Sequence, residues 1–433
     1  MSRKRRAKTK AAAQEQQALP PGMLWAIVAV FVVLSLLFNF RTPVGRNGYF
    51  HTPDEGAHLA YVRYVAEEGK LPRFEGYAGV GYEAHQPPLY YLLAAQIWKV
   101  GEWLPVPPAR AVRMLSTLLG VLLVLTTYRL ARTLLPEMPA VAAVSAGAIA
   151  FLPMHVALCS AVNNDSLTNL LFALVLLEFA LLYTQTKPSR WIALRMGLWA
   201  GLAGWTKVTS LLLLPTIVVG WLLVPRRSGI HLWRGMLVSV GLATALILPW
   251  GIRNLQLYDD PLLLKAFEQT FAVTARAEQF LQRGTSLTEY LQLVAGWTYR
   301  SFWFAYGTPQ TAASGLPNFL PERVYLLLGG VHLLSLAGFA LALWRERDLL
   351  GEATYRWYAL AGVLTLLVVG AFVRFILTYF QTQGRYLYPA LVPLQLTLAL
   401  GWRSLFPAHF RGVADGLLLL VLLAICILAV SVI

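Results

Sequence analysis

Long apolar stretches, separated by short polar breaks, recur along the chain from Leu24 to Ile433. A helix needs about 20 mainly apolar residues to cross the hydrocarbon core of a membrane, and many of these stretches approach that length. The pattern therefore predicts an all-α integral membrane protein with about eleven transmembrane helices. We place these spans near residues 23–40, 109–131, 139–158, 166–185, 192–206, 208–224, 235–252, 322–344, 357–378, 387–403 and 413–433.

Two segments between the predicted spans are too long and too polar to be simple turns. Residues 41–108 and 253–321 mix charged residues, glycine, proline and aromatic residues. Loops of this length usually carry function or structure of their own. We therefore expect one polytopic membrane domain over residues 23–433, in which 41–108 is a first outer loop with interfacial helices and 253–321 is a second large outer loop.

The composition agrees with a membrane protein and excludes an ordinary soluble globule, because 57% of the residues are hydrophobic and only 13% are charged. The formal net charge of +15 would suggest a nucleic-acid partner in a soluble protein. Here much of the positive charge lies beside predicted spans, where the preference for Lys and Arg in cytoplasmic loops explains it. We therefore expect no nucleic-acid partner.

The basic residues also orient the predicted spans. Residues 1–22 begin with several Lys and Arg and form a basic tail, which we place in the cytoplasm. The first span then runs outward, so that Arg132, Arg190 and Arg345 fall in cytoplasmic loops and the two long loops face outside. This arrangement predicts a multi-pass protein of the cell membrane, inner or plasma, with an extracytoplasmic active face.

The first outer loop contains an acidic pair at the predicted start of a helix. Thr52 suits the position before the helix, Pro53 suits its first position, and Glu55 completes a capping box. The helix dipole also favours acidic residues at this point without any catalysis. This account explains Glu55 better than Asp54, because the box does not use Asp54. Asp54 is therefore the stronger candidate for a functional carboxylate.

Two more polar clusters lie on the same predicted side of the membrane. Glu83 and His85 precede Pro87, which with the next proline fixes the start of a surface helix, and both are candidates for ligand or substrate contacts. Asp165 lies in an Asn-Asn-Asp-Ser run. That run is typical of a helix N-cap, here of the fourth span, but Asp165 could also be the functional partner of Asp54.

Late in the chain, Arg385 follows a flexible glycine, Gly384, at a predicted outer turn. An Arg at this position runs against the positive-inside preference, and a lone snorkelling Arg is the simple explanation. A planar guanidinium is also suited to bind two oxygens of a phosphate. Lys207, between the short spans 192–206 and 208–224, offers a second positive charge on the same side.

Taken in order, these motifs resemble those of polytopic glycosyltransferases of the GT-C superfamily. The resemblance is strongest to bacterial protein-mannosyltransferase-like members (glycosyltransferase family 39) and to aminoarabinose-transferase-like members. It covers most of the chain and rests on Pro53-Asp54-Glu55, His85-Gln86-Pro87-Pro88-Leu89, Asn164-Asp165, Thr206-Lys207, Pro249-Trp250 with Arg253-Asn254, and Gly384-Arg385-Tyr386.

The resemblance implies a donor made of a monosaccharide on a polyprenyl phosphate, and inverting transfer to a glycan, lipid or protein acceptor at the outer membrane face. By position, Asp54 matches the catalytic base of the family and Asp165 its second acidic residue. Lys207 and Arg385 match basic residues near the lipid phosphate. We group the candidates as catalytic (Asp54, Glu55, Asp165) and substrate-binding (His85, Lys207, Arg385, Tyr386).

A divalent metal ion is compatible with this chemistry, although the residue types alone do not identify one. Its candidate ligands are Asp54, Glu55, His58 and Asp165. 

Two other classes of function stay open. In a lipid or solute transporter or flippase, charged groups within the spans would mark a pathway, and Glu178 and His155 are the natural residues. Against this class, the acidic residues cluster at the outer loops. A non-catalytic membrane subunit with the same fold is the third alternative.

Overall fold

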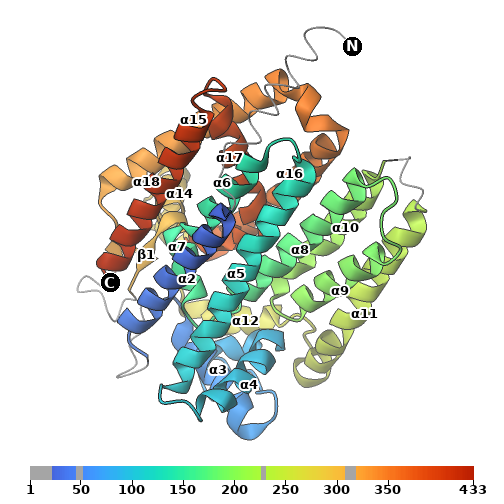
Figure 1. Cartoon of the computed structure of the whole chain (residues 1–433). Coiled ribbons are helices and arrows are strands. Elements are labelled where there is room, and N and C mark those ends of the chain that lie inside the picture. The colour runs from blue at the N-terminus through green and yellow to red at the C-terminus, as the bar shows by residue number, and fades with distance from the viewer. Residues whose placement is uncertain (1–21, 45–51, 226–230, 308–317) are drawn as a thin grey trace.

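The computed structural model describes residues 22–44, 52–225, 231–307 and 318–433, and nearly all of its regular structure is helical (Figure 1). Except for Gly22, the predicted basic tail 1–22 lies outside the described residues. Within them, seven helices are long and apolar enough to cross a membrane. They are α2 (Met23–Arg41), α5 (Pro108–Leu134), α8 (Asp165–Thr184), α11 (Leu232–Tyr258), α15 (Glu322–Arg345), α16 (Arg347–Thr378) and α18 (Arg411–Ser431).

Several predicted spans correspond to short or broken helices. The helices α6 (Pro139–Ala150) and α7 (Pro153–Cys159) form a single bent pair with a 64° break. Three single helices are shorter than this pair as a whole: α9 (Ile192–Gly204), α10 (Leu213–Leu222) and α17 (Leu391–Ser404). At 1.5 Å per residue such helices cover about 20 Å or less, which does not cross a bilayer alone. The predicted all-α membrane fold is confirmed, whereas the number of about eleven spans stays a prediction.

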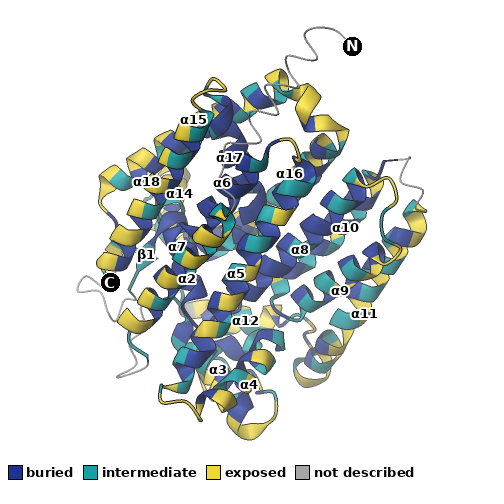
Figure 2. Cartoon of the chain, in the orientation of Figure 1, coloured by how far each residue is buried: buried dark blue, intermediate teal, exposed yellow. Residues whose placement is uncertain are grey.

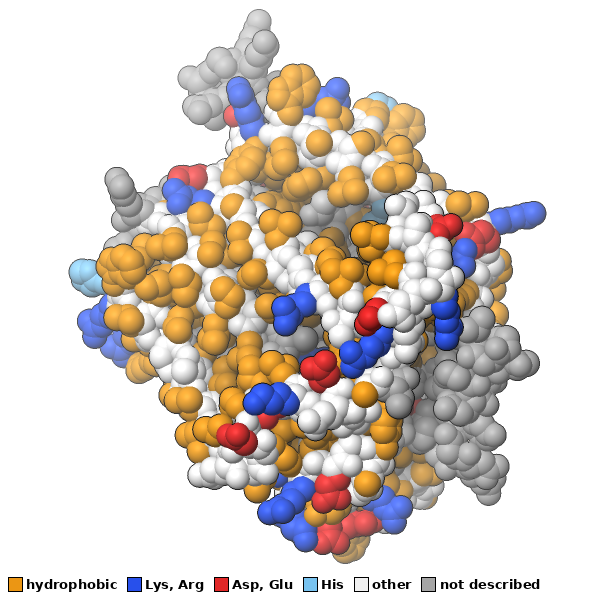
Figure 3. Space-filling model, turned by 180° about the vertical axis from the view of Figure 1, so that it is seen from behind, with side chains coloured by type: hydrophobic (Ala, Val, Ile, Leu, Met, Phe, Trp, Pro, Cys, Tyr) orange, Lys and Arg blue, Asp and Glu red, His pale blue; other side chains and the backbone are white. Residues whose placement is uncertain are grey.

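The helices differ in how much of their surface other helices cover. In α8, 83% of the most apolar window is buried, whereas the corresponding share is only 22–28% in α11, α15 and α16. Figure 2 shows α8 as an almost wholly buried helix in the middle of the bundle. In Figure 3, hydrophobic side chains cover much of one face, and charged side chains gather toward the bottom of the view. An apolar outer surface of this kind suits contact with lipid.

The two long polar segments fold into short helices, most of them at one end of the bundle, toward the bottom of Figure 1. The first contributes α3 (Glu55–Glu68), the 3₁₀ turn η2 (Tyr82–His85) and α4 (Leu89–Gly101). The second contributes α12 (Leu264–Thr270), η5 (Phe271–Val273), α13 (Ala277–Gln282), α14 (Leu287–Trp303) and the two-residue strands β1 (Ala305–Tyr306) and β2 (Asn318–Phe319), which pair antiparallel. Two more 3₁₀ turns, η3 (Val208–Leu212) and η6 (Gly384–Ala390), precede α10 and α17.

Candidate active site

Two carboxylates and two cations from distant parts of the sequence form one ion cluster. The Arg385 guanidinium pairs with Asp54 through one terminal nitrogen and with Asp165 through the other, the latter at 3.1 Å. Asp165 also accepts a hydrogen bond from the Lys207 ammonium group. The four residues singled out from the sequence therefore meet at one place, between the start of α3, the start of α8, the α9–η3 break and η6.

Asp54 has an unusual backbone conformation at the start of α3. Its φ of 64° lies in the left-handed region, which Asp tolerates better than most residues. The helix begins at Glu55, and Asp54 occupies the N-cap position without a side-chain capping bond. The predicted capping box with Thr52 as its first member is therefore wrong. Instead, the Asp54 carboxylate turns toward Arg385 and accepts a hydrogen bond from the Tyr82 hydroxyl at 2.8 Å.

These contacts keep Asp54 ionised. Burial by itself raises the pKa of the Asp54 carboxyl, but the positive charge of Arg385, the nearby His58 and the Tyr82 hydrogen bond together lower it more. The net shift of the pKa is downward. A carboxylate held in this state can accept a proton from a substrate at neutral pH.

Asp165 is positioned by its neighbours at the start of α8. The Asn163 side-chain oxygen accepts a hydrogen bond from the Asp165 backbone N–H at 3.0 Å, which satisfies one of the free donors of the first helical turn. Asn164 donates to the Thr206 carbonyl at 3.0 Å and so ties this turn to the break before Lys207. The chain segments that carry Asp165 and Lys207 are thus joined by a hydrogen bond beside their ion pair.

Arg385 owes its position to close packing of η6 against α14. A Cβ atom on Gly384 would overlap the backbone of Phe302 and Thr298, so only glycine allows this approach. The expectation of a flexible glycine is therefore wrong, because Gly384 is buried in a tight contact. The Arg385 Nε also donates to the Gln383 side chain at 2.6 Å. The guanidinium is thus held on both edges.

Glu55 lies next to Asp54 in the sequence but points elsewhere. Its carboxylate pairs with Arg113 of α5 through two hydrogen bonds of 2.7 and 2.8 Å, and it also accepts from the Val162 backbone N–H at 2.9 Å. Both side chains of the pair are about 1% exposed. Arg113 in turn donates to backbone oxygens at the end of α2, among them that of Thr42. The structure does not bring Glu55 into the ion cluster, and its contacts are those of a structural pair.

The other predicted residues lie around the cluster. The Tyr386 ring centroid is 5.6 Å from the Arg385 guanidinium carbon and 6.0 Å from the Lys207 nitrogen, so the ring sits beside both cations. His85 contacts the Tyr82 carbonyl oxygen through Nδ1 at 2.5 Å, and burial lowers the pKa of His85 to about 4. A neutral imidazole at this position can form hydrogen bonds, but it offers no positive charge to attract a phosphate.

The candidate metal ligands do not form a metal site. Glu55 is committed to Arg113, and Asp54 and Asp165 are both bound to cations. Within the described ranges, no group of three or more His, Cys, Asp or Glu side chains has the arrangement of a metal site.

Two neighbouring cavities, which share several lining residues, flank the ion cluster. The larger, of about 550 Å³, is lined by Asp54, His58, Tyr82, Glu83 and His85, by α12 residues such as Phe267, and by the end of α16. The smaller, of about 210 Å³, lies between α8, η3, α16 and η6 and has mainly apolar walls. Lys207, Arg385 and Tyr386 line both. The cations thus line both the larger cavity, which holds most of the polar side chains, and the smaller, mainly apolar one.

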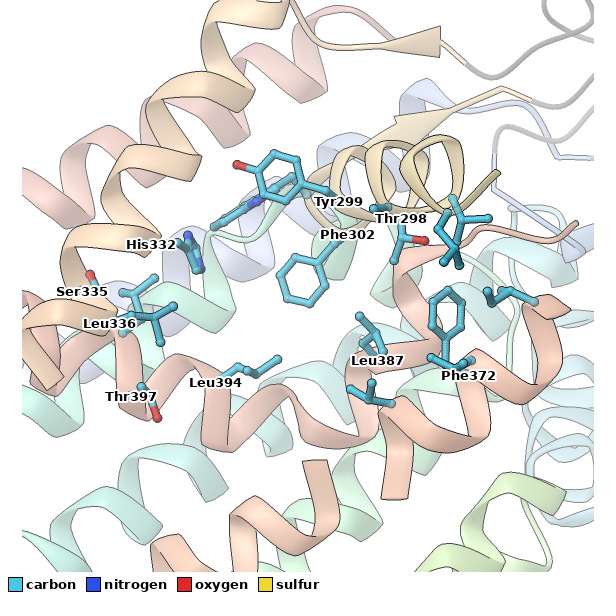
Figure 4. Close-up of a pocket in the computed structure, with 18 residues that line it drawn as sticks. Thr298, Tyr299, Phe302, His332, Ser335, Leu336, Phe372, Leu387, Leu394 and Thr397 are labelled. Atoms are coloured by element: carbon cyan, nitrogen blue, oxygen red, sulfur yellow. The ribbon is translucent and has the colours of Figure 1, made fainter. Parts of the chain in front are cut away.

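A third cavity, of about 590 Å³, lies between α14, α15, α16 and α17 (Figure 4). Of the described residues that line it, none is Asp, Glu, Lys or Arg. Phe372 contributes to this chamber and to the small cavity beside Arg385. Leu387 of η6, two residues after Arg385, lines this cavity (Figure 4).

Three residues with clear roles in this arrangement were not singled out from the sequence: Tyr82, Arg113 and Gln383. Arg113 carried a usable signal, since a charged residue inside an apolar span usually has a buried partner.

The transporter candidates do not join the cluster. Glu178 forms a two-bond ion pair with Arg195, and His155 contacts Cys159 at 3.3 Å.

The sequence model for the family described as dolichyl-phosphate-mannose-protein mannosyltransferase matches residues 85–252. Solved structures match over most of the chain. ArnT from Cupriavidus metallidurans, bound to undecaprenyl phosphate, superimposes with a TM-score of 0.56 at 16% identity, covering 88% of this chain and 60% of ArnT. The chain has the GT-C fold. The resemblance inferred from the motifs is therefore confirmed.

Two structures of the Archaeoglobus fulgidus oligosaccharyltransferase have the same fold. One, tethered to an acceptor peptide, gives a TM-score of 0.56 at 15% identity over 95% of this chain and 55% of its own. The other, with an inhibitory peptide and dolichol-phosphate, gives 0.57 at 14% identity over 94% and 55%. The chain thus spans 55–60% of the length of these matched structures. No curated protein sequence matches it significantly.

Proposed function

We propose that this GT-C protein transfers a monosaccharide from a polyprenyl-phosphate donor to an acceptor, with inversion at the anomeric carbon. The observation that carries the proposal is the ion cluster of Asp54, Arg385, Asp165 and Lys207 between a more polar and a mainly apolar cavity. Such a donor has one charged group between a polar sugar and a hydrocarbon chain. The order of the three environments matches the order of the three parts of the ligand.

The solved relatives support this class of donor. ArnT was crystallised with undecaprenyl phosphate, and the archaeal oligosaccharyltransferase was solved with dolichol-phosphate. Both ligands combine a phosphate with a polyprenyl chain. We infer that the phosphate of the donor binds at Arg385 and Lys207, where charge-assisted hydrogen bonds to phosphate oxygens are strongest. The apolar walls of the small cavity, among them Leu212, Val368 and Phe372, would then receive the first part of the chain.

The chemistry follows from the residues that face the larger cavity. An acceptor hydroxyl attacks the anomeric carbon, and its proton passes to the Asp54 carboxylate. The bond between the anomeric carbon and the phosphate oxygen breaks, and polyprenyl phosphate leaves with the electron pair. Because attack comes from the side opposite the leaving group, the configuration inverts. Arg385 and Lys207 stabilise the negative charge that grows on the phosphate, so no general acid is needed.

Asp165 has a positioning role in this scheme. It forms ion pairs with Arg385 and Lys207 and so holds both cations in place before a donor binds. Pre-organised charges cost no rearrangement during the reaction, which is the main way in which such groups accelerate it. Because Asp54, Glu55 and Asp165 are engaged in ion pairs, we route no step through a metal.

We place the reaction at the extracytoplasmic face of the cell membrane. The support is the positive-inside arrangement of the short loops, which puts the end of the bundle with α3 and α4 outside. A donor carried in the membrane would reach the small cavity sideways from lipid, and an acceptor would reach the larger cavity from water. The identity of the acceptor, whether glycan, lipid or protein, is left to experiment.

The test is a transfer assay in proteoliposomes. The purified protein is incubated with polyprenyl phosphates that carry radiolabelled monosaccharides and with an extract of cell-envelope acceptors. We expect label in an acceptor fraction and free polyprenyl phosphate in equal amount, with the opposite anomeric configuration in the product. Binding of the donors without turnover of any of them would favour a non-catalytic subunit, and movement of labelled lipid across the bilayer would favour a flippase.

A further inference from the structure

A second carboxyl group in the larger cavity takes no part in the ion cluster. Glu83 of η2 is buried, lines the cavity on the same side as Asp54, and follows Tyr82, which binds Asp54. Within the part of the chain that the structure describes, its Oε2 atom has no hydrogen-bond partner. The Glu83 side chain is 8% exposed and lines a cavity of about 550 Å³, and its Oε2 atom is buried in the wall of that cavity.

The nearest polar side chain does not satisfy this oxygen. His58 Nδ1 is 3.7 Å from Glu83 Oε2, beyond hydrogen-bond distance, and the same nitrogen contacts the Tyr91 hydroxyl at 2.7 Å. Burial raises the pKa of Glu83, and the charge of Asp54 adds to this effect, whereas His58 lowers it less. Burial also lowers the pKa of His58. Both shifts favour the neutral forms of the two groups.

An unpaired buried carboxyl is unusual, because such a group has lost its water without gaining a partner. Glu55 shows the ordinary structural solution in the same loop, since hydrogen bonds from Arg113 and Val162 satisfy its carboxylate. Among the residues that the structure describes, the Glu83 Oε2 atom has no such partner, and Glu83 lies in a cavity wall. A ligand that fills the cavity would supply the missing hydrogen bond.

We propose that Glu83, with His58 beside it, forms a hydrogen-bonding subsite for hydroxyl groups of the transferred sugar. The inference rests on the proposed function and names the part of the donor that this wall recognises. A neutral carboxylic acid donates through its O–H and accepts through its carbonyl oxygen, as a sugar hydroxyl also does. The sugar ring then contacts Glu83, and the phosphate lies at Arg385 and Lys207.

The arrangement also selects a class of sugar. A sugar that carries a carboxylate would place its negative charge near the ionised Asp54. An uncharged hexose or pentose with free hydroxyl groups satisfies Glu83 without this repulsion. We therefore assign the subsite to a neutral sugar.

The experiment compares Glu83→Gln and Glu83→Ala with the wild type in two calorimetric titrations. One ligand is a polyprenyl phosphate that carries a neutral hexose, and the other is the bare polyprenyl phosphate. Gln keeps a neutral donor and acceptor, so we expect it to bind the sugar-bearing lipid within about threefold of the wild type. Ala should weaken that binding about tenfold, the loss expected for one good hydrogen bond. Binding of the bare lipid should stay unchanged in both variants.

Bare-lipid binding also shows that the variants are folded, and Glu67→Ala, on the exposed face of α3, controls for loss of a carboxyl outside the cavity. Three results would overturn the proposal. Glu83→Ala could bind the sugar-bearing lipid as tightly as the wild type does, or it could lose as much affinity for the bare lipid as for the sugar-bearing one. Glu83→Gln could also bind the sugar-bearing lipid as weakly as Glu83→Ala does. If the wild type binds neither lipid, the proposed function fails at its first step, and that outcome is distinct from the other three.

Discussion

The Asp54 carboxylate lies against the Arg385 guanidinium, although 331 residues separate the two in the sequence. The same guanidinium binds Asp165, so one side chain of η6 fixes the first turn of α3 relative to the start of α8. Charges arranged in advance act more strongly in a cavity shielded from water than they would in solution. Several consequences of this arrangement can be measured.

Removing the Tyr82 hydroxyl should change the pH dependence of catalysis. In the wild type the pKa of Asp54 lies below its ordinary value, so Asp54 stays an ionised base as the pH falls toward about 4. Tyr82→Phe removes one of the interactions that lower this pKa, so the acid limb of kcat/KM should move upward. A hydrogen bond to a charged group is worth about 1.5–3 kcal/mol, which corresponds to about one to two pH units.

The measurement is kcat/KM for sugar transfer between pH 4 and pH 8, because this ratio reports the free enzyme. Tyr64→Phe, on the partly exposed face of α3, is the control and should leave the limb in place. An acid limb that moves downward in Tyr82→Phe would contradict the assignment of Asp54 as the base.

Glu55 should matter for stability through Arg113. Breaking a buried ion pair by removing one charge leaves the other charge without a counterion and costs about 3–5 kcal/mol. Glu55→Gln should therefore lower the thermal midpoint strongly in detergent. Glu178→Gln breaks a similar two-bond pair with Arg195, whose side chain is 36% exposed, and should cost less because water can solvate the remaining charge.

The midpoint of each variant can be followed by dye-based or calorimetric melting. Equal small changes in both variants would show that the Glu55–Arg113 pair contributes no more than a half-exposed pair does. 

Gly384 should be intolerant of a single added methyl group. A Cβ atom there would overlap the backbone of Phe302, so Gly384→Ala must push η6 away from α14 and move Arg385 with it. We expect about 1–3 kcal/mol of destabilisation and weaker binding of polyprenyl phosphate. Gly362→Ala, in α16, is the matched control, because no atom lies within 4 Å of its added Cβ. If both variants bind the lipid as the wild type does, η6 is not held by this contact.

The sequence predicts the membrane fold well, because spans depend on local apolar length. The pattern identifies α2, α5 and α8 to within a few residues. Local length does not decide how a short or bent helix crosses the membrane, and for that reason the pair α6 and α7 and the short α9 and α10 leave the span count open. Whether these helices cross the membrane depends on the helices that pack around them, and a short stretch of sequence carries no information about that packing.

The sequence also predicts much of the ion cluster but not its connections. Asp54 stands out because the capping box does not use it, and Arg385 because an Arg at an outer turn runs against the positive-inside preference. The capping box failed because tertiary contacts outweigh the local preference: Arg113 draws the Glu55 carboxylate inward, and Tyr82 draws that of Asp54 into the cavity. The partner of Glu55 lies 58 residues away, and spacing along the chain does not reveal such a pair.

The central claim is that Asp54 takes the proton from the acceptor while Arg385 and Lys207 hold the donor phosphate. The most direct measurement compares wild type and Asp54→Asn, at equal folded yield, for sugar transfer and for binding of polyprenyl phosphate. We predict that transfer falls by about 10²–10⁴-fold, the usual contribution of a general base, while the lipid still binds. Transfer at the wild-type rate by Asp54→Asn would contradict the account and leave Asp54 a structural partner of Arg385.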